Sequence, residues 1–270
     1  MTPLRFTLHS AGIMAPGLLS LDELRTVNRG EAAYAHSPLQ VPPPAKLPAQ
    51  ERRRASAAVR LVLACCEHAC GSRGIAQDEL YTVFATDEGT GEICQQMLDV
   101  LATTRQVSPL VFSNSVVNAP SGYFSIASGN RLSSTVVSLG LDSFAGGLLC
   151  AVTEAVTRQQ PVLLACYDVP MTPPMDEVLP VREGIASAWV ISSAGHESLP
   201  SLACFELALQ PARGIEPSAL PAWMPAAWQE HAAARALAAL AMLDSPAGAS
   251  MRFALGGQHM SLRLHDGGAQ

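Results

Sequence analysis

The segment 133–168, SSTVVSLGLDSFAGGLLCAVTEAVTRQQPVLLACYD, constrains the fold more than any other part of this chain. Residues 134–138 form a β-branched run, residues 143–157 a Gly-, Ala- and Leu-rich helical pattern, and residues 161–166 a continuous apolar run of strand length. A strand, a helix and a strand with short connections form a βαβ unit, whose strands are parallel and whose crossover is right-handed. Neither strand alternates polar and apolar residues, so we expect both faces of the sheet to be covered.

Hydrophobic periodicity and turn residues predict further elements on both sides of this unit. Those before it are a strand at 4–13, a capping box at Ser20–Glu23, a helix at 51–70, a strand at 81–86, and helices at 92–102 and 120–128. Those after it are strands at 187–193 and 201–209, expected to pair antiparallel, a helix at 226–243, a hairpin around Gly256 and Gly257, and a disordered tail at 266–270. Strands that alternate with helices indicate the α/β class.

Composition narrows the range of functions. The chain has 270 residues, of which 49% are hydrophobic and only 15% are charged, so either a partner covers part of its surface or its core is large and alanine-rich. A net charge of −6 argues against a nucleic-acid partner. We also expect no membrane span, because no apolar run is long enough, and no secretory signal. Seven irregularly spaced cysteines are typical of reduced thiols in the cytoplasm.

A cysteine-rich cluster raises the question of a metal site. Cys65, Cys66, His68 and Cys70 lie within six residues, and Cys66 and Cys70 share one helical face. No second ligand cluster follows at the spacing of a zinc site. We therefore expect cysteines that pack in the core of an amphipathic helix, and neither a metal nor another cofactor.

Three stretches carry a resemblance to a known family. They read FSNSVVNAPSGYFSIA at 112–127, STVVSLGLDSFAGGL at 134–148 and FALGGQHMSL at 253–262. The first two resemble the N-terminal half of a β-ketoacyl-ACP synthase of the thiolase fold, most closely the short chain-length-factor type of aryl-polyene-like pathways. The third resembles the glycine-rich terminal hairpin of those enzymes.

The resemblance implies the fold and its division. We expect an α/β, thiolase-like single domain over 1–270, with a part like the N-terminal half of a ketosynthase at 1–195 and a strongly reduced remnant of the C-terminal half at 196–270.

In the active family, a nucleophilic cysteine begins the helix that follows the central strand, and the resemblance places Leu141 at that position. Leucine cannot attack a thioester, and Cys150 lies two to three turns further along the helix. The neighbouring Asp142 would oppose thiolate formation at the helix N-terminus. The family's two histidine motifs are absent, since His196 and the other candidates, His231 and His259, match neither. We therefore expect no catalytic residue, and no enzyme activity from this chain by itself.

The resemblance also implies a partner, a catalytic β-ketoacyl-ACP synthase subunit that binds through the strand at 134–138 and brings the acyl carrier protein. An uncharged, β-branched edge without proline needs such a cover. The expected interface residues are Ser134, Thr135, Val136, Val137, Ser138, Asn114 and Asn118. The residues expected to line the end of the partner's acyl tunnel, unless they pack in the core, are Val116, Val117, Phe124, Leu139, Leu141 and Phe144.

Two alternatives remain. One is a homodimeric acyl-binding or scaffold module without a synthase partner. The other is a serine hydrolase that uses Ser143 at the strand-to-helix corner. The surrounding GLDSFAG is not the G-x-S-x-G motif of hydrolases, and a hydroxyl that caps the helix is the competing interpretation of Ser143.

Overall fold

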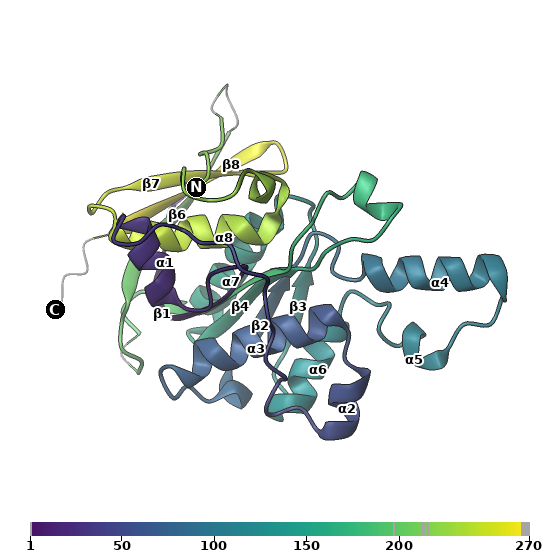
Figure 1. Ribbon diagram of the computed structural model, residues 1–270. Coiled ribbons are helices and arrows are strands. Elements are labelled where there is room, and N and C mark those ends of the chain that lie inside the picture. The colour runs from purple at the N-terminus through teal and green to yellow at the C-terminus, as the bar shows by residue number, and fades with distance from the viewer. Residues whose placement is uncertain (1, 197, 212–213, 215, 266–270) are drawn as a thin grey trace.

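The structure is a computed structural model that describes residues 2–196, 198–211, 214 and 216–265, so the tail predicted at 266–270 lies outside the described residues. Its centre is one mixed sheet of eight strands in the order β3-β2-β4-β5-β1-β6-β8-β7 (Figure 1). The strands are β1 Leu4–Met14, β2 Tyr81–Ala85, β3 Ser134–Val137, β4 Val162–Asp168, β5 Ile185–Ser193, β6 Ala203–Pro211, β7 Ser250–Leu255 and β8 Gln258–His265.

The predicted βαβ unit is confirmed. Strands β3 and β4 both pair in parallel with β2, which lies between them, and helix α7, Ser143–Arg158, connects the two. All residues of β4 are buried, as predicted. The expectation of two covered faces is wrong for β3, whose residues are exposed or half-buried, because β3 is the last strand of the sheet.

Helices cover both faces of the sheet (Figure 1). Helices α3, Ala57–Gly71, and α6, Ala119–Ser128, pack on one face around Phe84 and Tyr167. On the other face, α7 and α8, Ala232–Ala241, pack around Trp189 and Phe253. The remaining α-helices are α1 Leu21–Asn28, α2 Ala49–Arg54, α4 Gly91–Thr103 and α5 Pro109–Phe112. No helix within the described ranges combines the length and the hydropathy that a membrane crossing requires.

The thiols of α3 lie in the core, as predicted. Cys65, Cys66 and Cys70 are at most 2% exposed. Burial raises the pKa of the Cys65 and Cys66 thiols well above the ordinary value and that of Cys70 to about 11. The three thiols therefore stay protonated at neutral pH and act as apolar packing groups.

Two predicted helices are interrupted. The helix predicted at 51–70 is split into α2 and α3, because Ala55 is extended with ψ 130° and the hydroxyl of Ser56 accepts a hydrogen bond from the N–H of Val59 and caps α3. The helix predicted at 226–243 contains α8 between two short 3₁₀ turns, and His231 has an extended backbone where the first turn ends.

The predicted antiparallel pairing of β5 with β6 is wrong. Strand β1 lies between them and is antiparallel to both, so β5 and β6 run parallel to each other. The eleven-residue β1 is buried almost throughout, as a strand inside a sheet is. Burial of β1 therefore determines the strand order here, and the short connection between β5 and β6 does not. The β7–β8 hairpin is confirmed, and Gly256 and Gly257 adopt the positive φ values, 53° and 78°, that its two-residue turn needs.

A buried acid and a buried histidine lie close together where α8 meets the sheet. Asp168, at the end of β4, accepts hydrogen bonds from the Thr86 hydroxyl (2.7 Å) and the Asp87 N–H (2.8 Å). Its other oxygen lies 3.8 Å from Nδ1 of His231, the residue before α8. Burial raises the pKa of Asp168 to about 7 and lowers that of His231 to about 4.

These two pKa shifts predict opposite effects of pH on stability. The Asp168 pKa is raised, so the folded state holds a proton that the unfolded state has lost, and stability falls as pH rises from about 4 to about 7. The His231 pKa is lowered, so stability rises with pH between about 4 and 6.5. The free energy of unfolding of Asp168→Asn minus that of the wild type should therefore increase with pH over this range. The same difference for His231→Gln should decrease with pH. Urea denaturation at several pH values measures both, and two variants with the wild-type pH profile would contradict the assignment.

A close approach of α3 to β1 gives a second prediction. A β-carbon on Gly12 would lie 2.4 Å from the backbone oxygen of Cys65 and 2.8 Å from the backbone nitrogen of Ala69. Gly12→Ala should lower the free energy of unfolding by about 1–3 kcal/mol, because α3 must move away from the sheet. Gly122→Ala is the control, since its β-carbon would meet nothing within 4 Å, and it should leave stability unchanged or raise it by up to about 1 kcal/mol. Equal stability of the two variants in thermal denaturation would refute the close contact.

Candidate functional site

The corner between β3 and α7 is held by Ser143. Gly140 supplies the left-handed backbone of the turn, with φ 60°. The hydroxyl of Ser143 is fully buried, accepts from the Leu139 N–H (2.8 Å), and lies 2.7 Å and 2.9 Å from the carbonyl oxygens of Gly140 and Thr86. All of its hydrogen bonds among the described residues are to backbone groups. This arrangement favours the structural interpretation of Ser143 over a nucleophilic one.

Leu141 and Asp142 occupy the mouth of this corner. The side chain of Leu141 is half-buried at the position where the family's nucleophile is expected. Asp142 is the residue before α7, but its carboxylate makes no capping hydrogen bond and instead accepts from the Gly256 N–H at 3.0 Å. The acid therefore ties the β7–β8 hairpin to the corner. Cys150 is half-buried further along α7, and burial raises its pKa.

The three candidate histidines lie in different elements. His231 precedes α8, His259 is buried in β8, and His196 follows β5 beside His9. The hydrogen bonds of His231 and His196 go to Glu183 and Ser198, and none of the three histidines bonds to the corner within the described part of the chain. The corner thus contains the hydrocarbon side chain of Leu141 and the carboxylate of Asp142, which is hydrogen-bonded to the terminal hairpin.

The outer edge of β3 is open. The carbonyl oxygens of Ser133 and Val137 accept hydrogen bonds from Thr82 and Thr86, at the two ends of β2. Backbone groups of successive strand residues point to opposite sides, so Ser134 and Val136 direct their N–H and C=O groups away from β2. No described strand lies on that side. The edge carries neither a charge nor a proline that would protect it from pairing with another chain.

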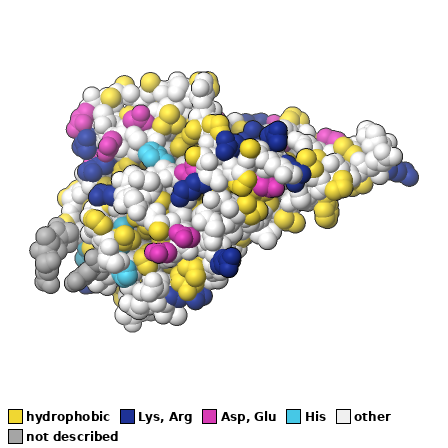
Figure 2. Space-filling view, turned by 90° about the horizontal axis from the view of Figure 1, so that it is seen from below, with side chains coloured by type: hydrophobic (Ala, Val, Ile, Leu, Met, Phe, Trp, Pro, Cys, Tyr) yellow, Lys and Arg dark blue, Asp and Glu magenta, His cyan; other side chains and the backbone are white. Residues whose placement is uncertain are grey.

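Helices α4 and α5 form an arm that projects from the body on the side of β3 (Figure 1). Only Gly91 and Gln95 of α4 are buried. Large apolar side chains of the arm are instead exposed by 45% or more, namely Leu98, Leu101, Leu110 and Phe112. Figure 2 shows hydrophobic side chains spread along this projection. Exposed apolar surface of this kind marks an interaction site.

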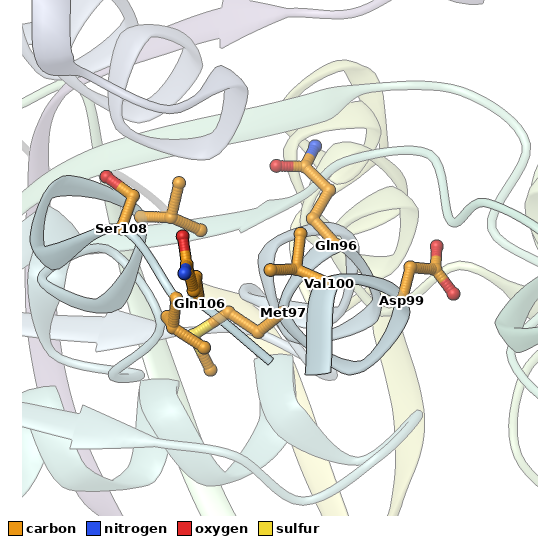
Figure 3. Close-up of a pocket in the computed structure, with 8 residues that line it drawn as sticks. Gln96, Met97, Asp99, Val100, Gln106 and Ser108 are labelled. Atoms are coloured by element: carbon orange, nitrogen blue, oxygen red, sulfur yellow. The ribbon is translucent and has the colours of Figure 1, made fainter. Parts of the chain in front are cut away.

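A cavity of about 400 Å³ separates the two helices of the arm. Met97 and Val100 of α4 face the segment that leads into α5, and Gln96, Gln106 and Ser108 surround them (Figure 3). The arm is therefore loosely packed between its own helices as well as exposed on its outside. The sequence analysis predicted a helix here but no role for the arm. The broad apolar stripe of α4 is the sequence signal that could have indicated an interaction surface.

The structure separates the residues predicted for the tunnel wall into two groups. Val116, Val117 and Leu139 are exposed by 46%, 39% and 51%. Phe124 and Phe144 are buried in the cores on opposite faces of the sheet, Phe124 against Phe84 and Phe144 against Trp189 and Phe253. The structure therefore does not bring these two rings together.

The residues predicted for the interface also differ in exposure. Ser134 and Ser138 are exposed, and Thr135, Val136 and Val137 are half-buried. Asn118 is exposed beside α6, whereas Asn114 is buried and donates to the carbonyl oxygens of Arg54 and Leu110. Asn114 thus fastens α5, at the end of the arm, to α2 within this chain.

Known proteins match this chain in fold and family. The model of the β-ketoacyl synthase N-terminal domain matches residues 27–219, which is more than half of the chain. No curated protein matches it.

Among solved structures, the complex of the ketosynthase ApeO with its chain length factor ApeC from Xenorhabdus doucetiae matches with a TM-score of 0.70 and 21% identity, over 95% of this chain and 99% of that one. The ishigamide ketosynthase/chain length factor matches with a TM-score of 0.69 and 16% identity, over 98% and 100%. A β-ketoacyl synthase from Burkholderia phymatum matches with a TM-score of 0.69 and 12% identity, over 97% and 99%. The chain has the thiolase-like ketosynthase fold and belongs to the β-ketoacyl synthase family.

Proposed function

We propose that this chain is a non-catalytic, chain-length-factor-like subunit that pairs with a catalytic β-ketoacyl-ACP synthase. The observation that carries the proposal is the open edge of β3 with the apolar arm beside it. The similar solved structures include two complexes of a ketosynthase with a chain length factor, which supports a partner of this kind. The chain would act in the cytoplasm as a single domain, with residues 196–270 as a reduced C-terminal part.

The edge of β3 supplies the geometry for pairing. A strand from the partner that lies beside β3 can accept from the N–H groups of Ser134 and Val136 and donate to their carbonyl oxygens. Each backbone hydrogen bond contributes about 0.5–1.5 kcal/mol. These bonds alone give little affinity, so a stable complex requires apolar burial as well.

The arm supplies that apolar burial. It projects on the side of β3, so a partner joined at β3 would lie against it (Figure 1). Leu98, Leu101, Leu110 and Phe112 would then leave water, at a gain of about 25 cal/mol per Å² of apolar surface. The low charge of the chain fits this use of its surface.

The β3–α7 corner supports a helper role. Leu141 offers no nucleophile, the Ser143 hydroxyl is enclosed by backbone groups, and the Asp142 carboxylate would raise the pKa of any thiol placed there. The partner would therefore carry out the decarboxylative condensation, on chains that the acyl carrier protein delivers to it in fatty acid, polyene or polyketide synthesis.

Chain length would be set by side chains that face the partner. Val116 and Val117 are exposed shortly after the arm, and Leu139 is exposed shortly after β3. Leu141 lies at the corner. A growing acyl chain that reaches these groups meets bulk that a rigid interface cannot move aside. Phe124 and Phe144 shape this wall only indirectly, because both pack in the core.

A proline at Val136 tests the edge. Val136→Pro removes an N–H that points away from β2, so the sheet of this chain keeps its own hydrogen bonds. Co-expression with the catalytic subunit and size-exclusion chromatography should show a complex at least about tenfold weaker than the wild type, because a hydrogen bond is lost and the ring obstructs the partner strand.

Val136→Thr is the matched control for this test, since it has nearly the same shape and retains the N–H. It should form the complex with the wild-type affinity. A folded Val136→Pro chain that binds as tightly as Val136→Thr would refute pairing through β3. A stable dimer of the chain with itself, and no complex with a synthase, would instead support the scaffold module.

A truncation at Leu139 tests the tunnel wall. Leu139→Ala removes an exposed side chain at the corner without opening the core, so the complex should persist and its products should become longer. Leu19→Ala is the control, because Leu19 is 45% exposed beside α1 and should leave product length unchanged. Mass spectrometry of the acyl chains measures the outcome. Products of unchanged length from an intact Leu139→Ala complex would exclude Leu139 from the wall.

A further inference from the structure

A cavity of about 280 Å³ lies beside the middle of β1, away from the proposed interface. Strand β6 pairs with β1 only over Leu4 to Leu8, so Ser10 and Ala11 are bordered by the start of α1, the end of α3 and Leu202. The β1–β5 pairing shifts by one residue between Leu8 and Ser10. Such a bulge redirects side chains and often adjoins a functional site.

Two polar atoms of the residues that line this cavity are buried without a hydrogen-bond partner among the described residues. They are the hydroxyl oxygen of Ser10, a residue only 2% exposed, and Nδ1 of His68. Roughly nine in ten buried polar groups have a partner in folded proteins. These two atoms have free hydrogen-bonding capacity that a bound group could use.

The charged groups around the cavity favour an anion. Arg73, at its rim, has no carboxylate within ion-pair distance in the described part of the chain. Arg25 also lines the cavity and is paired with Asp244 at 2.8 Å. The N-terminal end of α1 adds a partial positive charge, and the C-terminal end of α3 adds a partial negative one. Asp22 is the acid of the described lining and opposes an anion.

We propose that this cavity binds the oxyanion of a small molecule, a phosphate or a carboxylate group. The Ser10 hydroxyl and the His68 imidazole nitrogen donate hydrogen bonds to the anion, and Arg73 supplies the compensating charge. Strand β1 is separated from β3 by β2, β4 and β5, so the site is independent of the pairing edge.

Calorimetric titration of the full chain with inorganic phosphate, and separately with acetate, tests the site at pH 7. At least one anion should bind saturably with one site per chain. Ser10→Ala and Arg73→Gln should each weaken binding about tenfold, since each removes a bond to a charged group. Asp22→Asn should strengthen binding about threefold, because it removes a repelling charge.

The control is Arg53→Gln, which removes one exposed positive charge from α2 and should leave the affinity unchanged. Binding by phosphate alone or by acetate alone would identify which group the ligand carries. The proposal is overturned if neither anion binds saturably, or if Arg73→Gln binds the anion as tightly as Arg53→Gln.

Discussion

The outer edge of β3 is the feature on which this account depends. Its backbone donors and acceptors at Ser134 and Val136 have no neighbour among the described strands, whereas every other described strand except the terminal β7 lies between two. Strand β7 differs, since it carries the charged Arg252, whose backbone N–H and carbonyl oxygen bond to Ser218 outside the sheet. An edge without charge or proline, beside exposed leucines and a phenylalanine, is open to pairing with another chain.

The corner next to this edge has a leucine, Leu141, at the position that the resemblance assigns to the family's nucleophile. The turn through Gly140 and the buried Ser143 hydroxyl hold β3 at a fixed angle to α7. Asp142 binds the terminal hairpin instead of capping the helix. In the proposed function, these contacts hold the pairing strand β3 in place.

Local patterns in the sequence predicted the elements around this corner well. A strand at the run 134–138, the helix predicted at 143–157 and the buried strand predicted at 161–166 all form, the last extending to Asp168, because each has a strong pattern and clear end signals. The features of the fold that were not predicted depend on contacts between residues distant in sequence. The placement of β1 between β5 and β6 and the closeness of Asp168 to His231 have no local signature.

The arm was the main omission at the candidate site. Its helix α4 was predicted, but an apolar stripe alone does not tell whether the helix packs on its own sheet or projects from it. Phe144 was predicted to line the tunnel unless it packs in the core, and the structure places its ring in the core against Trp189.

Amide hydrogen exchange at β3 tests the central claim most directly. In the isolated chain, the amides of Ser134 and Val136 should exchange quickly, while those of Thr135 and Val137 are protected by β2. On formation of the complex with the catalytic synthase, Ser134 and Val136 should become protected as well. A stable complex in which both amides still exchange as quickly as in the free chain would contradict pairing through this edge.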